Sequence, residues 1–123
     1  MKTTNQTLLP AIQQGTANGN YDGTSLVFNS DASKGAGYYS RYARFMTASW
    51  HLTDFLGSVY IEATLNDDPE TGEYFQITDT LLGTTLEPLT EDASTNVEGK
   101  YTWVRTSVQD FTAGSITKIA ISY

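Results

Sequence analysis

Two stretches of this 123-residue chain alternate between apolar and polar side chains, and this pattern constrains the fold most. The first covers residues 45–52 and the second residues 59–65. A period of two places successive side chains on opposite faces of a β-strand. Turn residues separate the two stretches at 53–57, so the pattern predicts a β-hairpin with Trp50 and Ile61 on its inner face.

A second pair of β-prone stretches lies at the C-terminal end. Residues 101–108 are rich in β-formers, residues 115–123 alternate, and the short segment 110–114 joins them, which predicts a second hairpin. Further short strands are expected at 24–28, 73–78 and 81–86, and an acidic loop is expected through Glu91, Asp92 and Glu98.

No stretch shows a helical period, and the expected strands recur every 10–15 residues or so. Seven to eight short strands at this spacing are typical of a sandwich or barrel. The sequence therefore predicts an all-β fold, specifically an antiparallel, jelly-roll-like β-sandwich.

The first 23 residues differ in composition from the rest. They are rich in Thr, Asn, Gln and Gly, with a short apolar cluster that includes Leu8, Leu9 and Ile12. We expect an N-terminal arm over residues 1–23 and a β-sandwich domain over residues 24–123. The arm is either a docking segment that contacts a partner through the cluster or an ordinary frayed terminus.

The charge and composition argue against several kinds of partner. The chain carries 14 acidic and 7 basic residues, a net charge of −7, which repels a nucleic-acid backbone. No apolar run approaches the roughly 20 residues of a membrane-spanning helix, so no membrane contact is expected. The chain has no cysteine, which excludes disulfides and thiolate chemistry.

Candidates for catalysis or metal binding are few. The single histidine, His51, falls on the polar side of its strand, where a hydrogen-bonded surface histidine is expected. The acidic residues Asp67, Asp68, Glu70 and Glu73 offer oxygens for calcium, but their spacing does not match a calcium-binding loop and indicates a solvated turn. We therefore expect no enzyme activity, no cofactor and no metal.

Aromatic side chains are the more informative class. Tyr38, Tyr39 and Tyr42 cluster before the first alternating stretch, and Trp103 shares one face of its strand with Arg105. If the opposite face, which carries Val104, Thr106 and Val108, is the core, then Trp103 and Arg105 point outward as in protein interfaces. The alternative is that Trp103 is a core residue. An outward aromatic row would also suit stacking on sugar rings, as in a carbohydrate-binding module.

Several motifs resemble those of a known family. The segment 55–65, FLGSVYIEATL, the segment 99–105, GKYTWVR, and the closing segment 114–119, GSITKI, resemble small virion structural proteins of tailed phages, notably phages of cyanobacteria and other marine bacteria. Asp68-Pro69 and Tyr74-Phe75 match the turn and the aromatic pair of that pattern, with tyrosine where the family usually has tryptophan. The likeness covers about residues 50–123.

The resemblance implies a β-sandwich protein of a virion, assembled in the host cytoplasm. It implies a role in protein–protein contacts, first as a capsid decoration or cement protein and alternatively as a neck, tail or fibre accessory protein. The implied partners are the major capsid protein or neck and tail proteins. The same resemblance implies that the chain forms a homo-oligomer, with a trimer as the expected form. Candidate partner-contact residues are Leu8, Leu9, Ile12, Tyr38, Tyr39, Tyr42, Trp103 and Arg105.

Overall fold

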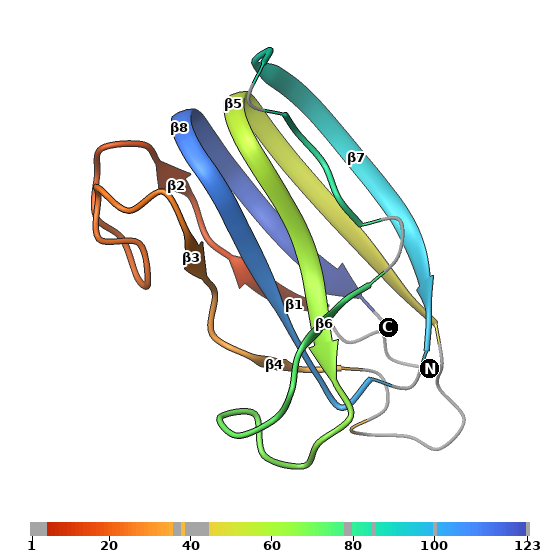
Figure 1. The fold of residues 1–123 in the computed structure, drawn as a ribbon. Coiled ribbons are helices and arrows are strands. Elements are labelled where there is room, and N and C mark those ends of the chain that lie inside the picture. The colour runs from red at the N-terminus through yellow and green to blue at the C-terminus, as the bar shows by residue number, and fades with distance from the viewer. Residues whose placement is uncertain are drawn as a thin grey trace.

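The computed structural model describes residues 5–35, 38, 45–77, 80–84, 86–99 and 101–122. Its eight elements are all β-strands, paired antiparallel in one sheet (Figure 1). They are β1 (Asn5–Leu9), β2 (Ile12–Gln13), β3 (Phe28–Asn29), β4 (Ser33–Lys34), β5 (Phe45–Thr64), β6 (Phe75–Gln76), β7 (Leu89–Glu98) and β8 (Trp103–Ser122). The all-β, antiparallel class is confirmed, but the expectation that every strand is short is wrong, because β5 and β8 have 20 residues each.

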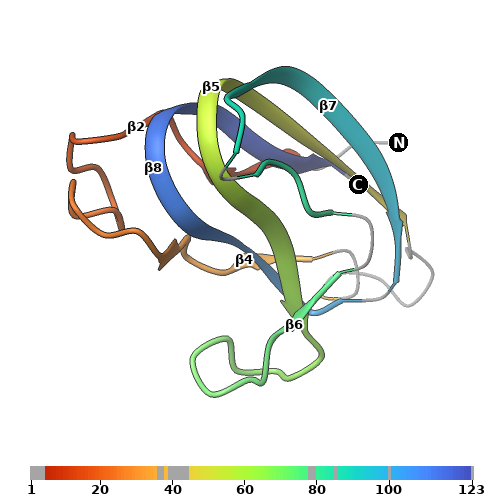
Figure 2. The same ribbon diagram turned by 45° about the horizontal axis from the view of Figure 1, so that its top comes forward.

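The two long strands build both layers of a sandwich. β5 and β8 pair with each other on either side of a common bend, and both arch over at that bend (Figures 1 and 2). The first layer contains the first half of β5 and the second half of β8, flanked by β7, β1 and β2. The second layer contains the other halves, flanked by β3, β4 and β6. The amide of Gln6 on β1 donates to the Lys34 carbonyl on β4 at 2.9 Å, which links the layers at one side.

Both predicted hairpins are therefore wrong. Residues 53–57 and 110–114 do not reverse the chain; they form bulges within β5 and β8, where the pairing register shifts. Asp54, Gly57, Asp110 and Gly114 all have positive φ, the conformation that also occurs in tight turns. The residue types of a turn and of a bulge are alike, so the sequence pattern does not separate them.

The bend requires glycine because the two backbones approach closely. A Cβ atom at Gly114 would lie 2.0 Å from the Asp54 carbonyl oxygen, and one at Gly57 would lie 2.8 Å from the Asp110 carbonyl oxygen. Backbone groups at the bulges form hydrogen bonds with neighbouring segments. Gln14 N–H donates to the Gly114 carbonyl at 3.0 Å, and Phe111 N–H donates to the Leu26 carbonyl at 2.9 Å.

The core lies between the layers and is filled from the alternating stretches. Trp50 and Ile61 are both buried, as predicted for the inner face. At the bend four aromatic rings pack together, with ring centroids 5.0 to 6.1 Å apart; they belong to Tyr21, Phe28, Phe55 and Phe111. The register shift in β5 keeps the inward side of the strand apolar, since the buried side chains change from Leu52 to Phe55 and then to Val59.

The N-terminal segment is part of the sandwich, because it pairs with β8 and buries Leu8, Leu9, Ile12 and Tyr21 in the core, which corrects the expectation of a separate arm. β1 pairs with β8 from Asn5↔Ser122 to Leu9↔Ile119, and β2 pairs with Ile116 and Ser115. Leu8, Leu9 and Ile12 are buried within the chain's own core, so they are corrected from partner contacts to packing residues. The physical reason is that their apolar side chains cover the edge of β8 in the first layer.

The expected acidic loop is also corrected. Residues 89–98 form β7, which pairs with β5 from Phe45↔Glu98 to Phe55↔Leu89. The polar composition of β7 explains why this strand was not predicted. Val97 is its one buried apolar residue, and its other side chains are exposed or half-buried. Conversely, the strand expected at 81–86 is reduced to an isolated bridge between Leu82 and Val59.

No helix among the described residues has the length and apolar character needed to cross a membrane.

Replacing Gly114 with alanine tests the bend. We expect Gly114→Ala to lower the free energy of unfolding by more than about 2 kcal/mol, because the new Cβ meets backbone as well as an unfavourable φ. Gly19→Ala is the matched control: Gly19 also has positive φ (+59°), but nothing lies within 4 Å of the position that its Cβ would take, so a loss of about 1 kcal/mol is expected. Equal losses in urea denaturation would contradict the close approach.

Candidate ligand-binding face

The outer face of the second layer gathers aromatic and charged side chains. Val104, Thr106 and Val108 are fully buried, so the alternate residues Trp103 and Arg105 point outward from β8. The question that the sequence left open is thereby answered: Trp103 is half-buried on the outer face and is not a core residue. We call the surface around it the Trp103 face, defined by Lys34, Tyr38, Glu62, Tyr74, Trp103 and Arg105.

Trp103 is held in place by its neighbours. Its indole Nε1–H donates to the Asp67 carbonyl at 2.9 Å, and the Tyr38 ring packs on it edge-to-face with centroids 5.3 Å apart. Tyr38 is 45% exposed, and the ammonium of Lys34 lies 4.5 Å from its ring centroid. Lys34 comes from β4, directly opposite Trp103 in the pairing register. This gives a ledge of two aromatic rings in fixed orientation.

Arg105 forms the polar half of the face. It lies opposite Glu62 across β8 and β5, and its Nε–H donates to the Glu62 carboxylate. Its guanidinium carbon also lies 3.8 Å from the centroid of the Tyr74 ring, a cation–π contact. Within the described part of the chain the guanidinium makes no other hydrogen bond, so its remaining N–H groups are available to a ligand.

A hollow of about 480 Å³ opens beside Arg105. Its lining residues are Ser30, Asp31, Ala32, Pro69, Glu70, Tyr74 and Arg105. Asp31 is fixed in position because the Asn20 side-chain amide donates to its Oδ1 at 3.0 Å. Tyr74 is fixed as well, since its hydroxyl donates to the Pro69 carbonyl at 2.9 Å. The hollow thus combines an arginine, two carboxylates and an aromatic ring, which together can donate and accept hydrogen bonds.

The surroundings of Tyr74 change its acidity. Desolvation by burial raises the pKa of the Tyr74 phenol above its ordinary value; the charge of Arg105 opposes this shift, and the charges of Glu62 and Asp68 add to it. The phenol is therefore neutral at physiological pH and acts as a hydrogen-bond donor.

The structure places some of the predicted partner-contact residues on one face and others in the core. Tyr38, Trp103 and Arg105 share the Trp103 face, whereas Leu8, Leu9 and Ile12 lie in the core. Tyr39 and Tyr42 lie outside the described residues. Glu62 and Tyr74 were not predicted as site residues. Glu62 lies beside Arg105 through the β5–β8 register, which the predicted hairpins gave wrongly, and Tyr74 reaches Arg105 from the loop before β6.

His51 lies apart from this face, whereas the acidic candidates of the turn reach its edge: the Asp67 carbonyl accepts from Trp103, and Glu70 lines the hollow. His51 makes a 2.9 Å hydrogen bond to Asp92 across β5 and β7, on the first layer. Asp68 accepts from the Glu70 backbone N–H at 2.9 Å, within its own turn. Among the described residues, no three histidine, cysteine, aspartate or glutamate side chains are grouped so that they could hold a metal ion.

No family model and no curated protein matches the chain. Among solved structures, the fold is similar to the SPBc2 prophage-derived protein YomS, with a TM-score of 0.57 and 15% identity over 98% of this chain and 91% of that one. Weaker likenesses include the family 29 carbohydrate-binding module CBM29_1 from Piromyces equi (TM-score 0.48, 14% identity, 99% of this chain and 91% of that one). Another is the CBM22-1 xylan-binding domain of Paenibacillus barcinonensis Xyn10C (TM-score 0.41, 8% identity, 77% and 70%).

The layered strand arrangement and the likeness to YomS define the class of the protein as a β-sandwich domain. The neighbours are a prophage-derived protein and several carbohydrate-binding modules. At 15% identity the likeness to YomS shows the shared fold and says nothing of a shared ligand.

The pKa of the Tyr74 phenol tests the packing around Tyr74 on the Trp103 face. We expect the Tyr74 phenol, followed by NMR, to titrate above pH 10. Because the folded-state pKa exceeds the unfolded one, the neutral phenol stabilises the fold below pH 10, and this contribution is lost as the pH rises through the folded pKa. Tyr74→Phe should therefore weaken the alkaline loss of stability, and Glu62→Gln should lower the Tyr74 pKa. A Tyr74 pKa at or below 10 would contradict the described packing.

Proposed function

We propose that this chain is a non-catalytic binding module that takes an uncharged glycan on the Trp103 face. The observation that supports this most is the joining of an aromatic ledge, Trp103 with Tyr38, to a hydrogen-bonding hollow around Arg105. A sugar ring has a C–H face, which packs on an aromatic ring, and a rim of hydroxyls, which exchange hydrogen bonds with charged groups.

Preorganisation supports the same proposal. The contacts of Trp103 with Asp67 and of Arg105 with Tyr74 hold both side chains before a ligand arrives. Little side-chain entropy is then lost on binding, which favours affinity for a small ligand. Trp103 and Arg105 are two residues apart on one strand, about 7 Å, so a ligand of more than one ring would contact both.

The charge of the face supports an uncharged ligand. Glu62 neutralises Arg105, and the negative charges of Asp31 and Glu70 around the hollow outnumber the one remaining positive charge among the residues that define the face, that of Lys34 beside Tyr38. The whole chain has a net charge of −7. Uronates and sulfated sugars would be repelled by this field, whereas a neutral glycan would not.

A second proposal concerns where the module works. The resemblance of residues 50–123 to virion structural proteins supports a place on a phage particle, with attachment to capsid, neck or tail proteins through protein–protein contacts. A capsid decoration or cement role, and a homo-oligomeric state, belong to this proposal. The two proposals are compatible, because a module attached to a particle by another surface would leave the Trp103 face open to a glycan.

Glycan binding is tested by calorimetry with neutral and acidic oligosaccharides. We expect at least one of cellohexaose, xylohexaose and mannohexaose to bind, and hexagalacturonate not to bind. Trp103→Ala should weaken binding about tenfold or more, since it removes the aromatic platform.

The matched control for this experiment is Leu86→Ala. Leu86 is 87% exposed and lies outside the Trp103 face, so its loss should leave binding unchanged. Binding of the acidic oligosaccharide, or unchanged affinity in a folded Trp103→Ala variant, would contradict the proposal.

The virion proposal is tested on particles from the native source. We expect the protein to co-sediment with purified phage particles through a density gradient and to be labelled on them by immunogold. The position of the label on head, neck or tail identifies the attachment site. Recovery of the protein in the particle-free fraction alone would count against a virion role.

A further inference from the structure

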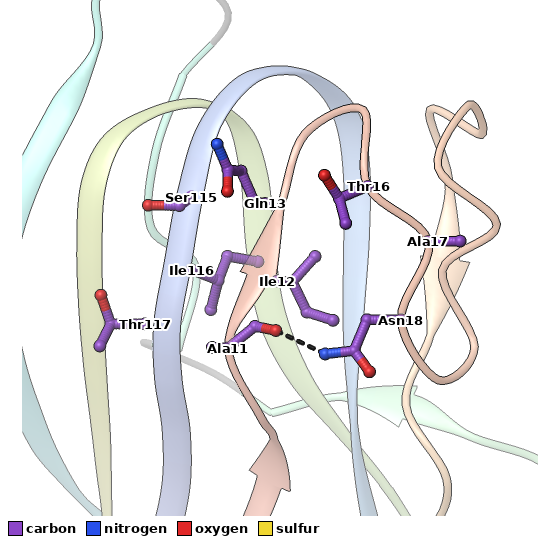
Figure 3. A pocket seen from close by; sticks show the side chains of 9 residues that line it. All are labelled: Ala11, Ile12, Gln13, Thr16, Ala17, Asn18, Ser115, Ile116 and Thr117. Carbon is purple, nitrogen blue, oxygen red and sulfur yellow. Dashed lines mark hydrogen bonds between the residues drawn. The ribbon is translucent and has the colours of Figure 1, made fainter.

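A second hollow lies on the other layer of the sandwich, between β2, the second half of β8 and the loop that follows β2 (Figure 3). Its volume is about 380 Å³. The lining residues are Ala11, Ile12, Gln13, Thr16, Ala17, Asn18, Ser115, Ile116 and Thr117. We call it the β2 pocket. It is separate from the Trp103 face, because β2 pairs with β8 beyond the bend.

The loop that forms one wall of the β2 pocket is tightly tied to the domain. Asn18 and Tyr21 exchange backbone hydrogen bonds of 2.9 and 3.1 Å, and the buried Tyr21 accepts from Gly15 N–H at 3.0 Å through its hydroxyl. The Asn18 side-chain amide donates to the Ala11 carbonyl at 2.7 Å across the hollow's base (Figure 3). The wall is therefore preorganised without a ligand.

Polar side chains line the β2 pocket without partners of their own. Gln13 and Ser115 lie opposite each other in the strand pairing, with Thr16 and Thr117 nearby (Figure 3). In the part of the chain that the structure describes, none of these four side chains makes a hydrogen bond. Hydroxyl and amide groups both donate and accept, so this set matches a ligand that does both.

The rest of the lining is aliphatic and none of it is charged. Ala11 and Ala17 contribute methyl groups, and Ile12 and Ile116 are buried isoleucines of the paired strands. A charged ligand would find no counter-ion here. Gln13, Thr16 and Thr117 are exposed and Ser115 is half-buried, so a purely apolar ligand would displace the water on these four side chains without replacing its hydrogen bonds. A ring with a C–H face and hydroxyl groups satisfies both parts of the lining.

We propose that the β2 pocket is a second saccharide-binding site, which takes one or two rings of an uncharged sugar. It acts independently of the Trp103 face and would make the module bivalent for glycans, a property that raises avidity for a polymeric or surface-bound ligand.

The test uses the Trp103→Ala variant, so that a failure of the face and a failure of the pocket are distinguished. The ¹⁵N-labelled protein is titrated with cellobiose, lactose, maltose and xylobiose, and with N-acetylneuraminic acid as the charged probe. We expect at least one neutral disaccharide to give saturable shifts confined to the amides of residues 11–18 and 115–117 and to the side-chain amides of Gln13 and Asn18.

Variants of the lining complete the test. Thr117→Val and Thr16→Val keep the shape and remove a hydroxyl, and each should weaken binding about fivefold. Thr95→Val, on β7 and outside the pocket, is the matched control and should bind as before. The proposal is overturned if no neutral disaccharide gives saturable shifts, if the shifts lie elsewhere, if the variants bind unchanged, or if N-acetylneuraminic acid binds as well.

Discussion

The close approach of the β5 and β8 backbones at their common bend sets the geometry on which the rest of the structure depends. At Gly114 and Gly57 a side chain would overlap a carbonyl oxygen of the facing strand, so the paired backbones leave no space for one there. The bulges turn both strands together, and one sheet becomes two layers. Phe55 and Phe111 fill the inside of the bend, so the same few residues both direct the backbone and begin the core.

The bend also determines which surfaces the chain offers. Because β8 runs through both layers, its first half presents Trp103 and Arg105 on one outer face, and its second half carries Ser115 and Thr117 at the β2 pocket. Pairing with β5 brings Glu62 beside Arg105, which is possible only in the register that follows the bulge. On the Trp103 face Glu62 pairs with Arg105, and Lys34 lies over the Tyr38 ring.

Alternation alone predicted the inner positions of Trp50 and Ile61, but it left Trp103 open between core and surface. Trp50 and Ile61 are buried as the period of two requires, and burial of Val104 and Val108 places Trp103 outside. The bulges could not be predicted from the sequence, because Asp and Gly residues adopt positive φ in bulges and in hairpin turns alike. β7 was missed because an edge strand with Glu91 and Asp92 carries the charges that discourage edge-to-edge pairing, and in sequence it looks like a loop. Contacts such as Arg105 with Glu62 need the register and cannot be derived from one sequence.

The bend turns Trp103 and Arg105 of β8 onto one outer face, where Tyr38 packs against Trp103, and we propose that this face binds a neutral glycan. Intermolecular nuclear Overhauser effects can be measured between the protein and whichever neutral hexasaccharide binds most tightly. We expect contacts from the indole protons of Trp103 and the ring protons of Tyr38 to the C–H protons of the sugar. Contacts confined to other aromatic residues, such as Phe75 or Tyr101, would contradict this proposal.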